Sequence, residues 1–131
     1  MFIFGKKSLS RLEGVHPDLV KIFKKAIGYS AIDFGISEGV RSKSRQAQLV
    51  KAGASTTLNS KHIIQESTGF SHAVDMYTIV DGRACWELDT YAVAGESIVK
   101  SAKELGINNL SWGACWHIDD VAGCEMGCMD M

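Results

Sequence analysis

The sequence lacks the features that would place it in a membrane or on nucleic acid. No apolar run approaches the roughly 20 residues that a membrane-spanning helix needs, and the apolar residues at the N-terminus precede the first lysines instead of following them as in a signal peptide. Fourteen basic residues against fifteen acidic ones give a formal net charge of −1, so no general attraction to nucleic acid or an anionic surface is implied. We therefore expect a protein that is made in the cytoplasm, with no membrane insertion and no nucleic-acid partner.

Cysteine is scarce and unevenly placed. The four cysteines are Cys85, Cys115, Cys124 and Cys128, so that three of them fall near the C-terminus. A disulfide framework is usually spread along a chain. Free buried thiols are the default for a reducing compartment, and metal ligation by at least one cysteine is the alternative.

Proline is scarcer still, and its single occurrence marks a helix start. Pro17 precedes an apolar stripe at helical spacing that runs to Ile27 and is followed by Gly28. The other patterns predict a strand over 31–36, a helix over 44–52, a loop over 53–71, a strand over 73–80, a helix over 88–105 and a strand over 108–112. The segment 117–131 has no clear periodicity. At 131 residues the chain is long enough to bury a core, and we predict one α+β domain over 1–131.

Two short runs carry the most chemical information, Ser60-Lys61-His62 and Ser71-His72-Ala73-Val74-Asp75. Imidazole and carboxylate suit a borderline metal such as zinc. Because His72 and Asp75 are three apart on a predicted strand, their side chains should point to opposite faces, which favours His62 as the partner of Asp75. Taken singly, a loop histidine is more often solvent-exposed, and an aspartate at a strand end is more often a cap or turn group.

These runs, together with Gly39-Val40-Arg41, Gln46 and Trp112-Gly113-Ala114-Cys115-Trp116, resemble the zinc-dependent peptidoglycan peptidases of the D,D-carboxypeptidase and L-alanyl-D-glutamate endopeptidase kind, which include small phage endolysins. The resemblance extends from about His16 to the C-terminus. It implies a small single-domain zinc peptidase fold with a short antiparallel sheet flanked by helices. It also implies that His62 and Asp75 bind zinc and that Arg41 holds the substrate or the developing oxyanion. Ser60 and Gln46 are expected to line the substrate cleft.

The chain departs from the family signature in the spacing of its ligands. The signature Ser-x-His-x-x-Gly-x-Ala-x-Asp separates histidine and aspartate by seven positions, whereas His62 and Asp75 are thirteen apart. The additional residues, within Ile63 to Ser71, are mostly polar and contain Gly69. If His62 binds the metal, these residues must bulge out as a loop.

The second departure concerns the third ligand. The family ends on an acidic residue, two others and a zinc-binding histidine, and this chain has Glu125-Met126-Gly127-Cys128 near its end. The resemblance therefore implies Glu125 as general base and Cys128 as a thiolate ligand. A thiolate in place of imidazole makes the metal a weaker Lewis acid. His117 and Cys124 are the other third-ligand candidates, and a degenerate site with no third ligand is the remaining one.

We therefore predict a zinc-dependent peptidase that cleaves peptidoglycan stem peptides, with the L-Ala–D-Glu bond favoured by the resemblance. It would act as a monomer on the cell wall after release through a holin-like pore. A D-Ala–D-Ala carboxypeptidase is the nearest alternative. Two others are a non-catalytic module that binds peptidoglycan or a protein, and a structural zinc held by Cys115, Cys124, Cys128 and His117.

Overall fold

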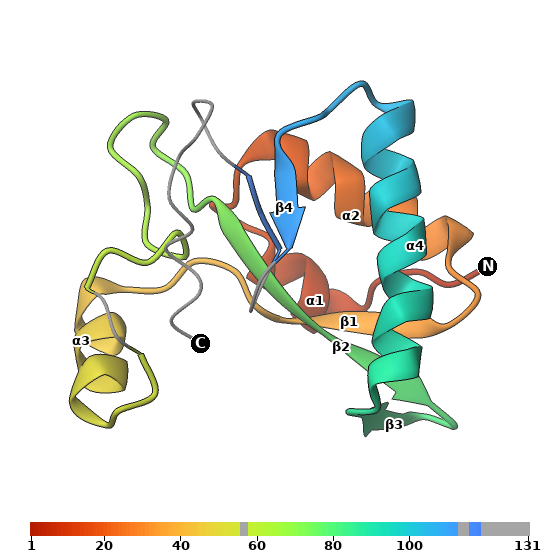
Figure 1. Cartoon of the computed structure of the whole chain (residues 1–131), viewed down its shortest axis with the longest axis horizontal. Helices are drawn as coiled ribbons and strands as arrows, with labels where there is room; N and C mark the ends of the chain where they lie inside the picture. The colour runs from red at the N-terminus through yellow and green to blue at the C-terminus, as the bar shows by residue number, and fades with distance from the viewer. Residues whose placement is uncertain (56–57, 113–115, 119–131) are drawn as a thin grey trace.

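Helices and an antiparallel sheet share one hydrophobic core in the computed structural model, which describes residues 1–55, 58–112 and 116–118 (Figure 1). The helices of this part of the chain are α1 (Lys6–Arg11), α2 (Pro17–Tyr29), α3 (Lys43–Lys51) and α4 (Leu88–Glu104). The strands are β1 (Asp33–Glu38), β2 (Ala73–Val80), β3 (Arg83–Cys85), β4 (Leu110–Trp112) and β5 (Trp116–Ile118). The predicted α+β class, with an antiparallel sheet flanked by helices, is confirmed.

The sheet is organised around β2, which pairs with three other strands. The strand order is β1-β2-β5-β4, with β3 also pairing with β2, and every pairing is antiparallel. β2 has the bounds that the sequence predicted, because its run of apolar residues is bounded by a turn at Asp81-Gly82. The short strands β3 and β5 and the helix α1 were not predicted.

The long helices begin and end near the positions that their sequence signals indicate. Pro17 is the first residue of α2, and the Nδ1 atom of His16 caps this helix by accepting a hydrogen bond from the Asp18 amide at 3.1 Å. α2 continues one residue beyond Gly28. α4 ends before Gly106, whose φ of 75° allows the left-handed turn that follows a helix. None of the helices in the described residues is long and apolar enough to cross a membrane.

Packing of α2 on α4 and of both on the sheet forms the core. The largest fully buried apolar side chains include Phe23 of α2, Phe34 of β1 and Ile98 of α4. α3 stands at the opposite end of the molecule from α4 and is joined to the sheet by the segments that carry His62 and Arg41 (Figure 1). The core therefore holds one end of the sheet, and the polar residues of interest lie toward the other end.

A β-bulge interrupts β1 close to its end. Ile36 pairs with Met76, but the next residue to find a partner is Glu38, which pairs with Asp75. Ser37 is the extra residue, and a bulge of this kind redirects the side chains that follow it. In a regular ladder Ser37 would lie opposite Asp75. The bulge instead brings a second carboxylate, that of Glu38, to Asp75.

Candidate metal centre

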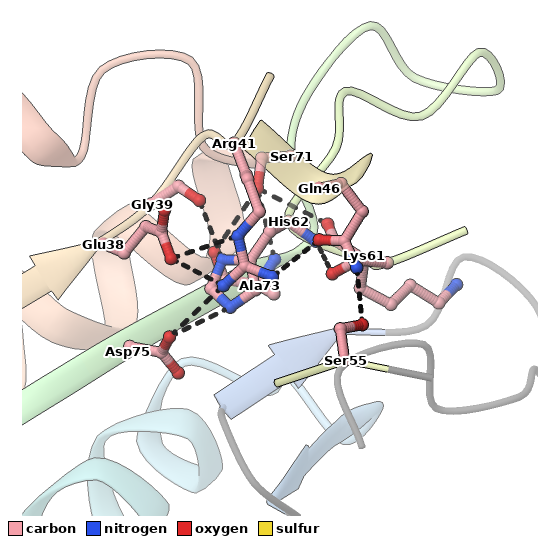
Figure 2. A network of polar contacts seen from close by, with 11 residues as sticks. Glu38, Gly39, Arg41, Gln46, Ser55, Lys61, His62, Ser71, Ala73 and Asp75 are labelled. Atoms are coloured by element: carbon pink, nitrogen blue, oxygen red, sulfur yellow. Dashed lines mark hydrogen bonds and ion pairs between the residues drawn. The ribbon is translucent and has the colours of Figure 1, made fainter. Parts of the chain in front are cut away.

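Three buried or half-buried side chains converge where β1 ends and β2 begins. These are Glu38, His62 and Asp75, and the ligand atoms that they offer lie within 4.8 Å of one another. Glu38 comes from the bulged end of β1, Asp75 from the start of β2, and His62 from the segment between α3 and β2 (Figure 2). One imidazole nitrogen and two carboxylates form a donor set that binds divalent metal ions.

A closed loop brings His62 to Asp75 despite their wide spacing. The His72 amide donates to the Lys61 carbonyl oxygen at 2.8 Å, so the chain on either side of the additional residues is joined at its base. Ile64 and Ser71 form an antiparallel bridge just above this bond. Residues 63–71 thus leave the sheet and return to it. His62 Nε2 consequently lies 3.3 Å from the Oδ2 atom of Asp75.

The tautomer of His62 follows from its neighbours. Its Nδ1 atom lies 2.8 Å from the Gly39 carbonyl oxygen, and a carbonyl only accepts hydrogen bonds, so Nδ1 carries the hydrogen. Nε2 is the ring nitrogen that faces the Asp75 carboxylate, at 3.3 Å from Oδ2. This Nε2 atom is buried and has no hydrogen-bond partner among the described residues. A ring nitrogen and a carboxylate oxygen that face each other away from water can share a metal ion, and an imidazole with its hydrogen on Nδ1 offers Nε2 as the ligand atom.

Arg41 neutralises the carboxylates from the other side. Its guanidinium donates to Glu38 Oε1 from Nε at 3.1 Å and from Nη2 at 2.5 Å, and Nη2 lies 3.8 Å from Asp75 Oδ2. The Nη1 atom donates to Gln46 Oε1 at 2.7 Å, and the Gln46 amide donates in turn to the Ser55 hydroxyl at 2.7 Å. Arg41 is only 2% exposed. Removing either Arg41 or Glu38 would therefore leave the other charged group without its directly bonded partner. These contacts hold the two carboxylates in place.

Ser60 and Gln46, the predicted substrate-binding residues, both lie at the site and are fully buried. The Ser60 hydroxyl accepts a hydrogen bond from the His62 amide at 3.1 Å. Gln46 bridges Arg41 and Ser55. These hydrogen bonds of both side chains are to neighbouring residues of the same chain. Their predicted contact with substrate stays a prediction.

The two other histidine candidates are buried in or beside the sheet. His72 is fully buried, but its Nδ1 atom lies 3.0 Å from the Ile118 carbonyl oxygen and its Nε2 atom 2.7 Å from the Thr68 hydroxyl. His117 is buried on β5, where it pairs with Ala73 of β2. Cys85 is a free thiol, as expected. The remaining candidates lie outside the described residues, and they are Glu125, Cys128, Cys124 and Cys115.

Sequence reasoning missed Glu38. The predicted strand ended at Ile36, and alternation alone gives no indication of a bulge at Ser37. The available signal was an acidic residue directly before Gly39-Val40-Arg41, three positions from an arginine that was itself singled out. An acid so close to a buried arginine pairs with it.

Glu38→Gln tests whether this carboxylate contributes to metal binding. We expect the affinity for a divalent ion, measured by competition with a chromophoric chelator, to fall by roughly 10–100-fold, as when a residue that orients or completes a metal site is changed. Glu13→Gln is the matched control, because Glu13 is exposed on the surface. Unchanged affinity in Glu38→Gln would limit Glu38 to its ion pair with Arg41.

A surface pocket opens beside the candidate metal centre. Its volume is about 700 Å³, and it is lined by Glu38, Val40, Arg41, Ser42, Lys43, Arg45, Ile63 and Ile64. Three of these side chains are cationic, and two isoleucines supply apolar surface. The pocket is therefore suited to a ligand that combines carboxylates with short aliphatic groups.

Comparison with known proteins gives consistent matches over nearly the whole chain. Residues 1–130 match the family described as phage L-alanyl-D-glutamate peptidase. The L-alanyl-D-glutamate peptidase of Escherichia phage T5 is 32% identical over 120 residues, which cover 88% of this chain and 82% of the phage protein. The crystal structure of the Serratia marcescens L-Ala D-Glu endopeptidase ChiX aligns with a TM-score of 0.78 and 37% identity, over 89% of this chain and 90% of that one.

Proposed function

Because the chain belongs to the phage L-alanyl-D-glutamate peptidase family, we propose that it is a zinc-dependent peptidoglycan endopeptidase that cleaves the L-Ala–D-Glu bond of stem peptides. We further propose that it works as a monomer and reaches the cell wall through a holin-like pore. A peptidase of peptidoglycan fits both named relatives. Zinc is proposed from the donor set and from the resemblance in the sequence.

The single observation that carries the metal is the buried imidazole of His62. Its Nε2 atom faces the Asp75 carboxylate at 3.3 Å, while Nδ1 is committed to the Gly39 carbonyl oxygen. We propose His62 and Asp75 as protein ligands and Cys128 as the third, with Glu38 beside them. When bound there, zinc would supply Lewis acidity toward a peptide carbonyl and toward water.

The proposed roles of the other residues follow from their chemistry. Glu125 would take a proton from the attacking water and return it to the leaving amine. Arg41 would hold a substrate carboxylate or the developing oxyanion, in addition to its bonds to Glu38 and Gln46. The pocket lined by Lys43 and Arg45 supports an acidic stem peptide as the substrate, because the cations offset its carboxylates.

The test compares metal content and cleavage in the wild type and three variants. We expect one zinc per chain in the wild type, loss of it in Cys128→Ala, and retention in Cys128→His. Glu125→Gln should keep the zinc and lose hydrolysis by on the order of 10²–10⁴-fold, the usual contribution of a general acid–base group. Mass analysis of the products from purified wall peptides identifies the bond.

Each result has a contrary outcome. If Cys128→Ala retains its zinc, the third ligand is a residue other than Cys128. Full activity in Glu125→Gln removes Glu125 from proton transfer. Release of terminal D-alanine in place of fragments split after L-alanine would make the enzyme a carboxypeptidase. A wild type that holds no metal and cleaves no wall peptide would refute the proposed function.

A further inference from the structure

Three aromatic rings, here called the aromatic shelf, continue the sheet face that carries Asp75. The shelf consists of Tyr77, Trp86 and Tyr91. Tyr77 follows Asp75 by two residues on β2, and side chains two apart on a strand point to the same face. Its ring covers Gly35 of β1, since a methyl group on Gly35 would lie 2.9 Å from the ring. The shelf therefore begins beside the metal centre.

Trp86 forms the outer part of the shelf. Its ring centroid lies 6.4 Å from that of Tyr77 and 6.5 Å from that of Tyr91, and it stacks on Tyr91 with an interplanar angle of 26°. Despite these contacts, Trp86 is 70% exposed. The contacts with Tyr77 and Tyr91 restrict the rotamers of Trp86, while one face of its ring stays open to solvent. Such a preorganised ring suits a flat ligand, because little side-chain entropy is lost on binding.

The charges near the aromatic shelf differ from those of the pocket beside the candidate metal centre, here called the basic pocket because Arg41, Lys43 and Arg45 line it. The pKa of Tyr91 is raised by burial, in opposition to a hydrogen bond from the Thr78 backbone, and the nearby Cys85 and Asp75 raise it further. Tyr91 is thus a neutral hydroxyl within the electrostatic reach of Asp75. The residues that follow Trp86 include the exposed acids Glu87 and Asp89. Carboxylates at this edge repel an acidic peptide and accept hydrogen bonds from neutral hydroxyl groups.

We propose that the aromatic shelf binds an N-acetylhexosamine ring of the glycan strand that carries the stem peptide. Such a sugar is uncharged, presents a flat array of C–H groups for stacking on Trp86, and bears hydroxyls for Glu87 and Asp89. The inference rests on the proposed function, because it takes the glycan from the peptidoglycan substrate. It adds a second binding region that no residue assigned so far supplies.

The covalent structure of peptidoglycan sets the required distance. L-alanine is attached through a lactyl group to muramic acid, so the sugar begins roughly two residue lengths, about 7 Å, from the L-Ala–D-Glu bond. Two residues along β2, from Asp75 to Tyr77, also span about 7 Å, and the Trp86 ring centroid lies 6.4 Å from that of Tyr77. A sugar that begins over Tyr77 would therefore extend toward Trp86. The basic pocket includes residues of α3, whereas the shelf is beside β3 at the other end of β2 (Figure 1). A substrate that crosses the metal centre would therefore place its acidic peptide toward α3 and its glycan toward β3.

Trp86→Ala is the direct test, with Trp86→Phe as the conservative variant. Tyr29→Ala is the matched control, since Tyr29 is an aromatic residue of α2 that is 45% exposed and donates a hydrogen bond to Glu104 of α4. Hydrolysis is measured on a disaccharide-linked stem peptide and on the same peptide without sugar. We expect Trp86→Ala to raise KM about tenfold for the sugar-linked substrate only, the effect of losing one well-placed aromatic contact. Trp86→Phe should restore most of this loss, and Tyr29→Ala should match the wild type.

A second measurement is independent of hydrolysis. Chitotetraose contains only N-acetylglucosamine, and its binding to the zinc-loaded wild type should be weakened about tenfold by Trp86→Ala. If the wild type binds chitotetraose through Trp86 but cleaves no wall peptide, the shelf stands and the proposed function fails. Equal loss on both peptide substrates, or unchanged chitotetraose binding, overturns the shelf. Loss of binding to phosphatidylglycerol vesicles without loss of sugar binding would assign Trp86 to a membrane surface instead and would also overturn it.

Discussion

Replacing His62 by alanine is expected to remove the bound metal and to lower peptide hydrolysis by roughly 10³-fold or more, since a metal supplies several kcal/mol of transition-state stabilisation. The reason lies in the arrangement of its two nitrogens. Nδ1 is held by the Gly39 carbonyl oxygen at 2.8 Å, and Nε2 is aimed at Asp75 from a fully buried position. Loss of the ring leaves the two carboxylates facing Arg41 without a nitrogen donor. Metal analysis and a cleavage assay on the same preparation measure both effects.

The matched control for this prediction is His72→Ala. His72 is also fully buried, but its two nitrogens contact Ile118 and Thr68 rather than Asp75. We expect His72→Ala to lower thermal stability while the metal is retained. Metal that persists in His62→Ala and disappears in His72→Ala would reverse the assignment and make His72 the ligand.

Gly39→Ala is expected to destabilise the fold by about 3 kcal/mol, the upper part of the usual range for an atom forced into a packed site. A Cβ atom on Gly39 would lie 2.0 Å from the Arg11 carbonyl oxygen and 2.8 Å from Val15 Cγ2. The Arg11 oxygen belongs to the backbone and has no rotamer to escape into. For a chain of this size the expected fall in Tm is about 10 °C, which differential scanning fluorimetry measures.

The same substitution should also weaken the metal centre, because the Gly39 carbonyl oxygen orients His62. Gly28→Ala is the control, since its Cβ would meet only Met1 Cγ at 4.0 Å within a helix. Alanine has the better helix propensity, so this variant should be as stable as the wild type or more stable. A Gly39→Ala protein with wild-type Tm and metal content would contradict the role given to this close approach.

The sequence predicted those helices and strands whose ends and apolar pattern are determined by their own residues. Pro17 and the apolar stripe after it give α2, and the apolar run bounded by Asp81-Gly82 gives β2. The helix α1 has weak signals of its own. It is held partly by tertiary contacts, such as the Ser8 hydroxyl, which accepts from the Ile36 amide at 3.0 Å. Helices this short are marginal alone, so α1 could not be predicted.

The short strands and the bulge illustrate a second limit. β3 and β5 each contain three residues, too few for alternation to be recognised. The bulge at Ser37 exists only in the pairing of β1 with β2. His62 and Asp75 were predicted to come together because the ligand chemistry is visible in the sequence. Glu38 joins them through register, a property of two strands that neither strand encodes alone.

The loop between His62 and Asp75 has a consequence for how this protein can vary. The bond from the His72 amide to the Lys61 carbonyl oxygen and the bridge between Ile64 and Ser71 close the loop at its base. The relative positions of His62 and Asp75 therefore depend little on how many residues the loop contains between Ile64 and Ser71. Because lengthening a flexible loop costs only about 0.6 kcal/mol per doubling, this segment is where the chain can gain or lose residues, or accept a grafted peptide, while its chemistry is kept.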